Sequence, residues 1–77
     1  MKILFFGRLG ETIGREIEHE LPPQGCTVAE LRAALAKTHG VLAAESVRAC
    51  IDHEIAPETA LVLPRHEVAF IPPLSGG

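Results

Sequence analysis

The sequence predicts an α+β fold in which a single main helix packs on one face of a mixed sheet. Two unbroken apolar runs, Ile3 to Phe6 and Val68 to Ile71, lie near the two ends of the chain and are typical of strands covered on both faces. Between them, one segment that begins at Thr27 has apolar residues at helical spacing. With 77 residues and a hydrophobic content of 47%, the chain suffices for one small domain. We therefore predict a single domain over residues 1–77, with a flexible C-terminal tail over residues 72–77.

The first third of the chain is expected to contain two strands. Ile3 to Phe6 forms the first, and Gly7 ends it. Leu9 to Ile13 lies among three glycines, and we predict a turn or one short helical turn there. Arg15 to Leu21 alternates between apolar and acidic residues, which is typical of a half-exposed strand. The residues expected on its inner side are Ile17, His19 and Leu21, and those expected on its solvated side are Glu16, Glu18 and Glu20.

The main helix is predicted to begin after Thr27. Glu30 follows three residues later, a spacing at which the two side chains cap each other's backbone amides. Gly40 is expected to end the helix in a left-handed conformation. The residues at helical spacing are Val28, Leu31, Leu35 and Thr38.

Further strand segments are predicted in the second half of the chain. Val47 to Asp52 reads as a strand, and Asp52-His53 as a tight reversal into a short segment around Ile55. Leu61 to Leu63 is apolar but stands between prolines, so we expect a short edge strand or a turn. Glu67 to Ile71 is the last strand.

The order β-β-α-β-β is that of a β-grasp arrangement, with the first and last strands side by side and parallel at the centre of the sheet. One helix can cover only one face of such a sheet. The other face is expected to carry an apolar patch, which on a soluble monomer is more often a docking surface than an accident. Its residues are expected to be Leu4 and Phe6 or Ile3 and Phe5, together with Ala69 and Ile71 or Val68 and Phe70.

Charge and length exclude two classes of partner. The formal net charge is -3, and the seven basic residues are scattered, so we expect no nucleic acid as the main partner. The apolar run after Met1-Lys2 is too short for a signal peptide or a membrane span, so we expect a cytoplasmic protein without a membrane partner. Cys26 and Cys50 are isolated in the sequence, which indicates neither a disulfide framework nor a zinc site.

The side chains offer weak candidates for catalysis. The four histidines are dispersed, without the spacing of a metal pair or a nucleophile's partner. Gly7-Arg8-Leu9-Gly10 follows a strand but lacks the lysine of a phosphate-binding loop. We therefore predict no catalytic residue, no metal site and no bound cofactor in this chain, which would not be an enzyme on its own.

The most informative feature is the end of the chain, Leu74-Ser75-Gly76-Gly77. A carboxylate that is activated by ATP and then attacked needs an approach that no β-carbon obstructs, and glycine supplies it. Pro72-Pro73 fixes φ and holds the root of the tail extended. An extended tail from Pro72 to Gly77 reaches roughly 20 Å, enough to enter a partner's active site. The alternative reading is a frayed terminus without function.

Three stretches of the sequence resemble the small, sulfur-carrier subunit of molybdopterin synthase. These are Lys2 to Leu9 followed by Gly14, then Thr27 to Leu31, and above all Glu67 to Gly77. The last stretch contains the most specific motif, Val-Ala-Phe-x-Pro-Pro-x-Ser-Gly-Gly, and the resemblance covers essentially the whole chain.

The resemblance implies a ubiquitin-like β-grasp fold and a role in molybdenum cofactor biosynthesis. Gly77 would be adenylated by an E1-like adenylyltransferase that uses ATP, converted to a thiocarboxylate through a sulfur donor system, and carried to the large synthase subunit. There it would give its sulfur to a cyclic pyranopterin precursor, two carriers serving two large subunits in a heterotetramer. Leu74, Ser75 and Gly76 would thread the active site, and the residues implied near the partner interface are Phe6, Phe70, Ile71, Pro72 and Pro73.

Two departures from the family pattern are visible, and three alternatives stay open. Ile71 stands where an aromatic residue is frequent, and Arg65-His66 replaces a common Gly-Asp turn. A carrier of another pathway, such as that of the thiamine thiazole, shares the fold and the Gly-Gly end. A ubiquitin-like protein modifier would instead join Gly77 to a lysine. A simple interaction domain would have an idle tail, and deleting Gly76 and Gly77 would leave its activity untouched.

Overall fold

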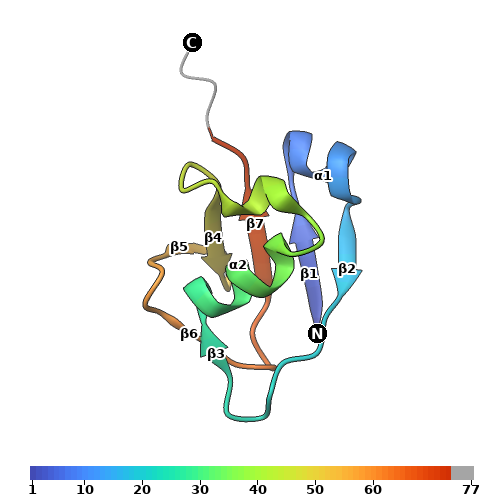
Figure 1. The fold of residues 1–77 in the computed structure, drawn as a ribbon. Helices are drawn as coiled ribbons and strands as arrows, with labels where there is room; N and C mark the ends of the chain where they lie inside the picture. Colours follow the sequence, from blue (N-terminus) through green and yellow to red (C-terminus); the bar gives the residue numbers. More distant parts are fainter. Residues whose placement is uncertain (74–77) are drawn as a thin grey trace.

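The structure is a computed structural model that describes residues 1–73. Five strands form one twisted sheet in the order β2-β1-β7-β4-β5, and two short strands form a second sheet, β3-β6 (Figure 1). The elements are β1 (Lys2–Phe5), α1 (Gly7–Ile13), β2 (Glu16–Glu18), β3 (Cys26–Thr27), α2 (Val28–Ala36), η1 (Gly40–Ala43), β4 (Arg48–Ile51), β5 (Glu54–Ala56), β6 (Leu61–Val62) and β7 (Val68–Ile71).

The first and last strands are central and parallel, as the sequence predicts. Ile3 pairs with Val68 and Phe5 with Phe70, while β2, β4 and β5 pair antiparallel to their neighbours. The sheet is therefore mixed, and the fold is an α+β, ubiquitin-like β-grasp. The reversal at Asp52-His53 is also confirmed, because both residues have positive φ, at 49° and 73°.

Helix α2 begins with the predicted capping box. The Glu30 amide donates to Oγ1 of Thr27 at 3.1 Å, and the Thr27 amide donates to Oε1 of Glu30 at 2.8 Å. The predicted end is wrong, since α2 stops at Ala36 and Gly40 begins the 3₁₀ helix η1. Gly40 is not among the residues with positive φ in the described chain, so it does not form the left-handed stop.

Segment 7–13 forms a longer helix than the sequence predicts. Instead of one turn at most, α1 has seven residues, and its Leu9 is buried in the core. Glycine allows this helix to lie close to β1, because a β-carbon at Gly10 would stand 2.9 Å from the carbonyl oxygen of Phe5. Gly10 therefore serves close packing here, although the three glycines of this segment predict a break from propensity alone.

The small β3-β6 sheet is partly a surprise. Leu61–Val62 forms the short strand that the sequence allows, but its partner, Cys26–Thr27, was not predicted. Gly25 has φ +82°, and a β-carbon there would collide with the carbonyl oxygen of Val62. The small sheet thus joins the start of α2 to the segment that leads into β7.

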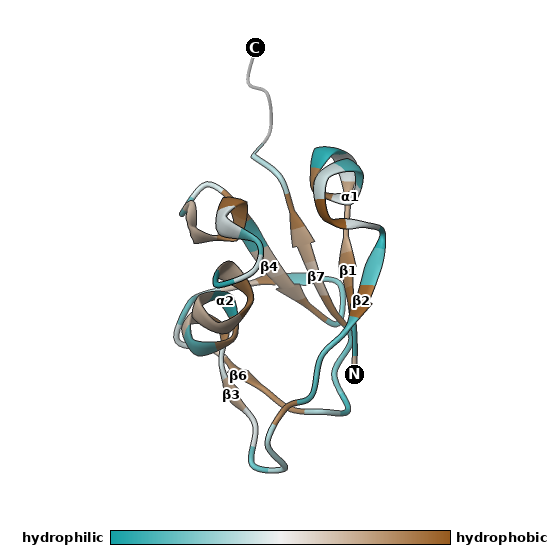
Figure 2. Cartoon of the chain, turned by 45° about the vertical axis from the view of Figure 1, so that its right-hand side comes forward, coloured by the Kyte–Doolittle hydropathy of each residue, from teal (hydrophilic) through white to brown (hydrophobic). Residues whose placement is uncertain are grey.

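The core lies between α2 and one face of the five-stranded sheet. Figure 2 shows the apolar residues concentrated on β1, β7 and β4, whereas β2 and the loops are largely hydrophilic. The buried side chains on the covered face of β1 and β7 are Ile3, Phe5, Val68 and Phe70, and α2 contributes Val28, Leu31 and Leu35. The Phe5 and Phe70 rings are stacked with centroids 5.9 Å apart.

Candidate docking face and tail root

The sheet face opposite α2 is a candidate interface. The register places one residue of each strand in a row across this open face, and these residues are Glu16, Leu4, Ala69, Cys50 and Ile55. Ile55 is 59% exposed, and Phe6, which follows β1, is 50% exposed. Exposed apolar side chains that extend a half-buried row are typical of a docking surface.

Phe6 also borders a hollow on the open face. The hollow has a volume of about 170 Å³ and is lined by Leu4, Phe6, Cys50, His53, Glu67 and Ala69. Its polar side is formed by Nε2 of His53 and Oε1 of Glu67, which are 3.3 Å apart. A partner side chain that enters here would meet an apolar floor and a polar edge.

The alternation left open by the sequence is resolved by the strand register, together with the burial of Ile3 and Phe5. Leu4 and Ala69 belong to the open face, while Ile3, Phe5, Val68 and Phe70 belong to the covered face. Phe70 is 0% exposed, so its predicted position near the partner interface is not one that a docking partner can touch. Its side chain faces α2 because strand residues alternate between the two faces and Phe70 pairs with buried Phe5.

The root of the tail is fixed to the start of α1. The Phe6 amide donates to the carbonyl of Phe70 at 3.1 Å, which extends the β1-β7 pairing up to the tail. Gly7 has φ +55°, and a β-carbon there would stand 3.0 Å from Cγ of Pro72. Pro72 is half-buried and Pro73 is exposed. The two prolines therefore leave the body of the protein at a defined place, beside Phe6 and Gly7.

Four of the predicted site residues, Leu74, Ser75, Gly76 and Gly77, lie outside the described residues. Their assigned roles, threading for the first three and adenylation for Gly77, stay predictions. Of the predicted interface residues that the structure describes, Phe6, Pro72 and Pro73 surround the start of the tail, and Ile71 is half-buried at the end of β7.

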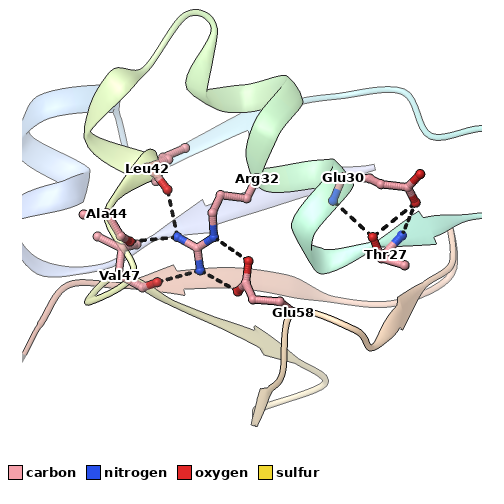
Figure 3. Close-up of polar contacts among 7 residues, drawn as sticks. All are labelled: Thr27, Glu30, Arg32, Leu42, Ala44, Val47 and Glu58. Carbon is pink, nitrogen blue, oxygen red and sulfur yellow. Dashed lines mark hydrogen bonds and ion pairs between the residues drawn. The ribbon is translucent and has the colours of Figure 1, made fainter.

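A buried arginine behind the tail root was missed by the sequence analysis. Arg32 on α2 is 8% exposed, and its guanidinium lies 5.6 Å from the ring centroid of Phe70. Nε and Nη2 donate to the carboxylate of Glu58, both at 2.9 Å (Figure 3). Nη1 and Nη2 also donate to three carbonyls, those of Leu42, Ala44 and Val47.

This arginine ties η1 and the start of β4 to α2 and to the segment before β6. The sequence gives one weak signal for it, a charged residue directly after the buried Leu31 of an apolar helix stripe. Its partner Glu58 is 26 residues away, so spacing along the chain could not identify the pair. Arg32 is a structural residue that positions the covered face.

Catalytic or metal chemistry finds little support among residues 1–73. No group of three or more His, Cys, Asp or Glu side chains in this range is arranged to hold a metal ion.

Burial, and to a smaller extent the charge of Glu30, raises the pKa of the Cys26 thiol. None of the helices in residues 1–73 has the length and apolarity required to cross a membrane.

Comparison with known proteins identifies the family. The model of the ThiS family matches residues 3–77, so the chain belongs to the ThiS family of small β-grasp sulfur carriers. Proteins of this family are non-catalytic and bind no cofactor. Membership in the family implies two partners, an E1-like activating enzyme and a further protein of the pathway. No curated protein matches the chain in sequence.

Solved structures agree on the fold. SAMP1 from Haloferax volcanii is 23% identical with a TM-score of 0.78, and the match covers 99% of this chain and 97% of that one. A second structure, of the H. volcanii small archaeal modifier protein 1, is 20% identical with a TM-score of 0.76 and 95% coverage of both chains. A Pyrococcus furiosus protein provisionally assigned as molybdopterin converting factor, subunit 1, is 23% identical with a TM-score of 0.78 and 95% coverage of both chains.

Proposed function

We propose that this chain is the small, sulfur-carrier subunit of molybdopterin synthase in molybdenum cofactor biosynthesis. The observation that carries the proposal is the run from Val68 to Gly77, in which a central strand passes through two prolines into a terminal Gly-Gly. The membership in the ThiS family supports the carrier role. The likeness to the P. furiosus protein named above agrees with the pathway but shows the fold alone.

The chemistry proposed for the tail takes place on the carboxylate of Gly77. The carboxylate attacks the α-phosphorus of ATP on an E1-like adenylyltransferase, and pyrophosphate leaves. A persulfide of the donor system then attacks the acyl carbon and displaces AMP, which gives an acyl disulfide. A thiol of the donor system attacks the donor's sulfur atom in this bond, so that the donor system ends as a disulfide and the thiocarboxylate of Gly77 is released. On the large synthase subunit this sulfur attacks the cyclic pyranopterin precursor and displaces an oxygen substituent, so that a thioester joins the two molecules. Water then hydrolyses the bond between the acyl carbon of Gly77 and the sulfur, which restores the carboxylate and leaves the sulfur on the precursor.

The body of the protein supplies docking rather than catalysis in this scheme. Phe6, Ile71, Pro72 and Pro73 lie at the end of the sheet from which the tail leaves. A partner that covers the open face there also controls where the tail begins, because Pro72 is held against Gly7. Orienting a reacting group in this way supplies part of the barrier reduction that an active site needs.

The test measures whether the chain acquires a sulfur atom at Gly77 and which enzyme then consumes it. The chain is incubated with ATP, an E1-like activating enzyme and a sulfur donor, and its intact mass is measured, with a Gly77-deleted chain as the control. We expect a mass gain that matches replacement of one oxygen by sulfur in the full chain alone. The thiocarboxylated carrier is then offered to the large synthase subunit with the pyranopterin precursor, or to a thiazole synthase. Consumption of the thiocarboxylate by the thiazole synthase alone would assign the chain to the other pathway.

A second candidate function is protein modification, because the H. volcanii small archaeal modifier protein 1 has the same fold, although this likeness too shows the fold alone. In that case the activated Gly77 would form an amide bond with a lysine of another protein. Covalent adducts that survive a denaturing gel, and that disappear when Gly77 is deleted, would support the modifier. If no adducts form in the presence of a competent activating enzyme, the modifier function is rejected and the carrier function is retained.

A further inference from the structure

A groove beside the tail root is separate from the open face. It lies between α1, η1 and the two prolines and has a volume of about 560 Å³, within the range of ligand pockets in proteins. Buried Leu9 and Val47 form its floor. Its walls are mostly apolar, with one cationic side chain from Arg8, and they are formed by Gly7, Arg8, Thr12, Val41, Pro72 and Pro73. Val41 is 44% exposed on the 3₁₀ helix η1, so its side chain is accessible in the groove.

The tail is too short for a partner to avoid this end of the molecule. Four residues follow Pro73, and fully extended they span about 14 Å. Any active site that holds Gly77 must therefore come within that distance of Pro73. Figure 1 shows α1 and the end of β7 at one end of the molecule, opposite the N-terminus. The groove opens at the same end, since Pro72 and Pro73 belong to its lining.

We propose that a short apolar segment of the E1-like activating enzyme occupies this groove when it takes the tail. The proposal rests on the proposed carrier function and adds a second contact on the other side of the tail from the open face. Activation of Gly77 is the step that the carrier and the modifier readings share, which is why we assign the groove to the activating enzyme. The lining favours aliphatic or aromatic side chains, because its floor and most of its walls are apolar.

The groove is coupled to the fold by two independent contacts. Arg32 Nη1 donates to the carbonyl of Leu42 at 2.7 Å and fixes η1, which carries Val41. Gly7 fixes the opposite wall against Pro72. The walls are thus in place before a partner arrives, and a pre-formed groove costs less to fill than one that must be ordered on binding.

The test measures carrier-dependent exchange of pyrophosphate into ATP by the activating enzyme. Thr12→Arg fills the groove from an exposed position, and Val41→Asp adds a charge to its wall. We expect each to raise the KM for the carrier at least tenfold while kcat stays within about twofold, because binding is weakened and Gly77 is intact. Leu61→Asp is the matched control, since Leu61 is 53% exposed on β6 at the other end, and its KM should not change.

Each contrary result has a defined meaning. A KM within twofold of that of the full chain for correctly folded Thr12→Arg and Val41→Asp would overturn the inference and leave the proposed function standing. A lower KM would overturn it in favour of the chain's own tail as the occupant, and a defect confined to the transfer of sulfur would overturn it in favour of the acceptor protein. If the full chain supports no more exchange than a Gly77-deleted chain, both the proposed function and the inference are rejected.

Discussion

The two faces of the central strands are made from similar residues but are used differently. On the covered face, the rings of Phe5 and Phe70 stack under α2. The guanidinium of Arg32, which belongs to α2, lies over the Phe70 ring. On the open face, Leu4 and Ala69 occupy the alternate positions of the same two strands, with Phe6 exposed beside them. An unbroken apolar strand therefore has one side that packs in the core and one side left uncovered as a candidate docking surface, and the position of the helix decides which side is which.

The largest effect should come from removing the ring on the covered face. Phe70→Ala is expected to lower the free energy of unfolding by about 3–5 kcal/mol, since it deletes a fully buried ring. Phe6→Ala, the same change on the open side, should cost less than about 1 kcal/mol because Phe6 is half-exposed. Urea unfolding of both variants measures the difference, and equal losses would show that the two faces are not distinct.

Removal of Arg32 should come next. Arg32→Met keeps most of the side-chain volume but leaves the carbonyls of Leu42 and Val47 without a donor. We expect a loss of about 3 kcal/mol in the free energy of unfolding. Glu58→Gln is the matched control, because Glu58 is half-exposed and its amide can still accept one hydrogen bond. A larger loss for Glu58→Gln than for Arg32→Met would contradict the role given to the three carbonyls.

On the open face the effect should appear in binding instead of stability. Phe6→Asp is expected to weaken the complex with the activating enzyme by about 2 kcal/mol, roughly thirtyfold in Kd, if Phe6 is an interface anchor. Titration calorimetry gives the affinity, and the melting temperature should change little. Unchanged affinity would remove Phe6 from the proposed interface.

The cap of the helix that covers one face should have a moderate effect. Thr27→Ala removes the acceptor for the Glu30 amide and is expected to cost about 1 kcal/mol. For a domain of this size that corresponds to a fall in melting temperature of about 4–8 °C. Thr27→Ser retains the hydroxyl and should recover most of the loss. A Ser variant as unstable as the Ala variant would mean that the methyl group, not the cap, matters.

The smallest effect concerns the thiol of Cys26. Because the pKa of Cys26 is raised, little thiolate is present at pH 8, and its alkylation by iodoacetamide should be slow. Raising the pH through the elevated pKa should accelerate the reaction. Glu30→Gln should increase the rate by less than about tenfold, since burial is the larger cause and persists. A peptide-mapping time course measures both, and a rate that does not depend on pH would refute this assignment.

The sequence predicts the central part of the fold because that part follows simple patterns. The parallel pairing of the end strands follows from two continuous apolar runs, and the start of α2 from the Thr27 and Glu30 spacing. Helix α1 and strand β3 escaped prediction for a common physical reason. Both are stabilised by close backbone approaches, of Gly10 to Phe5 and of Gly25 to Val62, which propensity does not describe.

The candidate site divides in the same way. The exposed Phe6 and the two prolines could be placed from their position beside the predicted central strands and the tail. The side on which Phe70 lies had to be left open, because an apolar run has no polar residue to mark which side faces the helix, and the structure buries Phe70 on the covered face. The groove beside η1 could not be predicted, since the sequence gives no pattern for a four-residue 3₁₀ helix held by Arg32 from another element.

The parallel pairing of β1 and β7 also determines how the protein bears tension. The tail leaves at the far end of β7, while the N-terminus lies at the opposite end of the neighbouring β1 (Figure 1). A pull on Pro73 against a body held at its N-terminal end therefore loads the hydrogen bonds between the two strands in shear. These bonds must give way together instead of opening one after another. The pairing of β1 and β7 should therefore resist a pull on Pro73 along the strands better than a pull that opens the strands from one end.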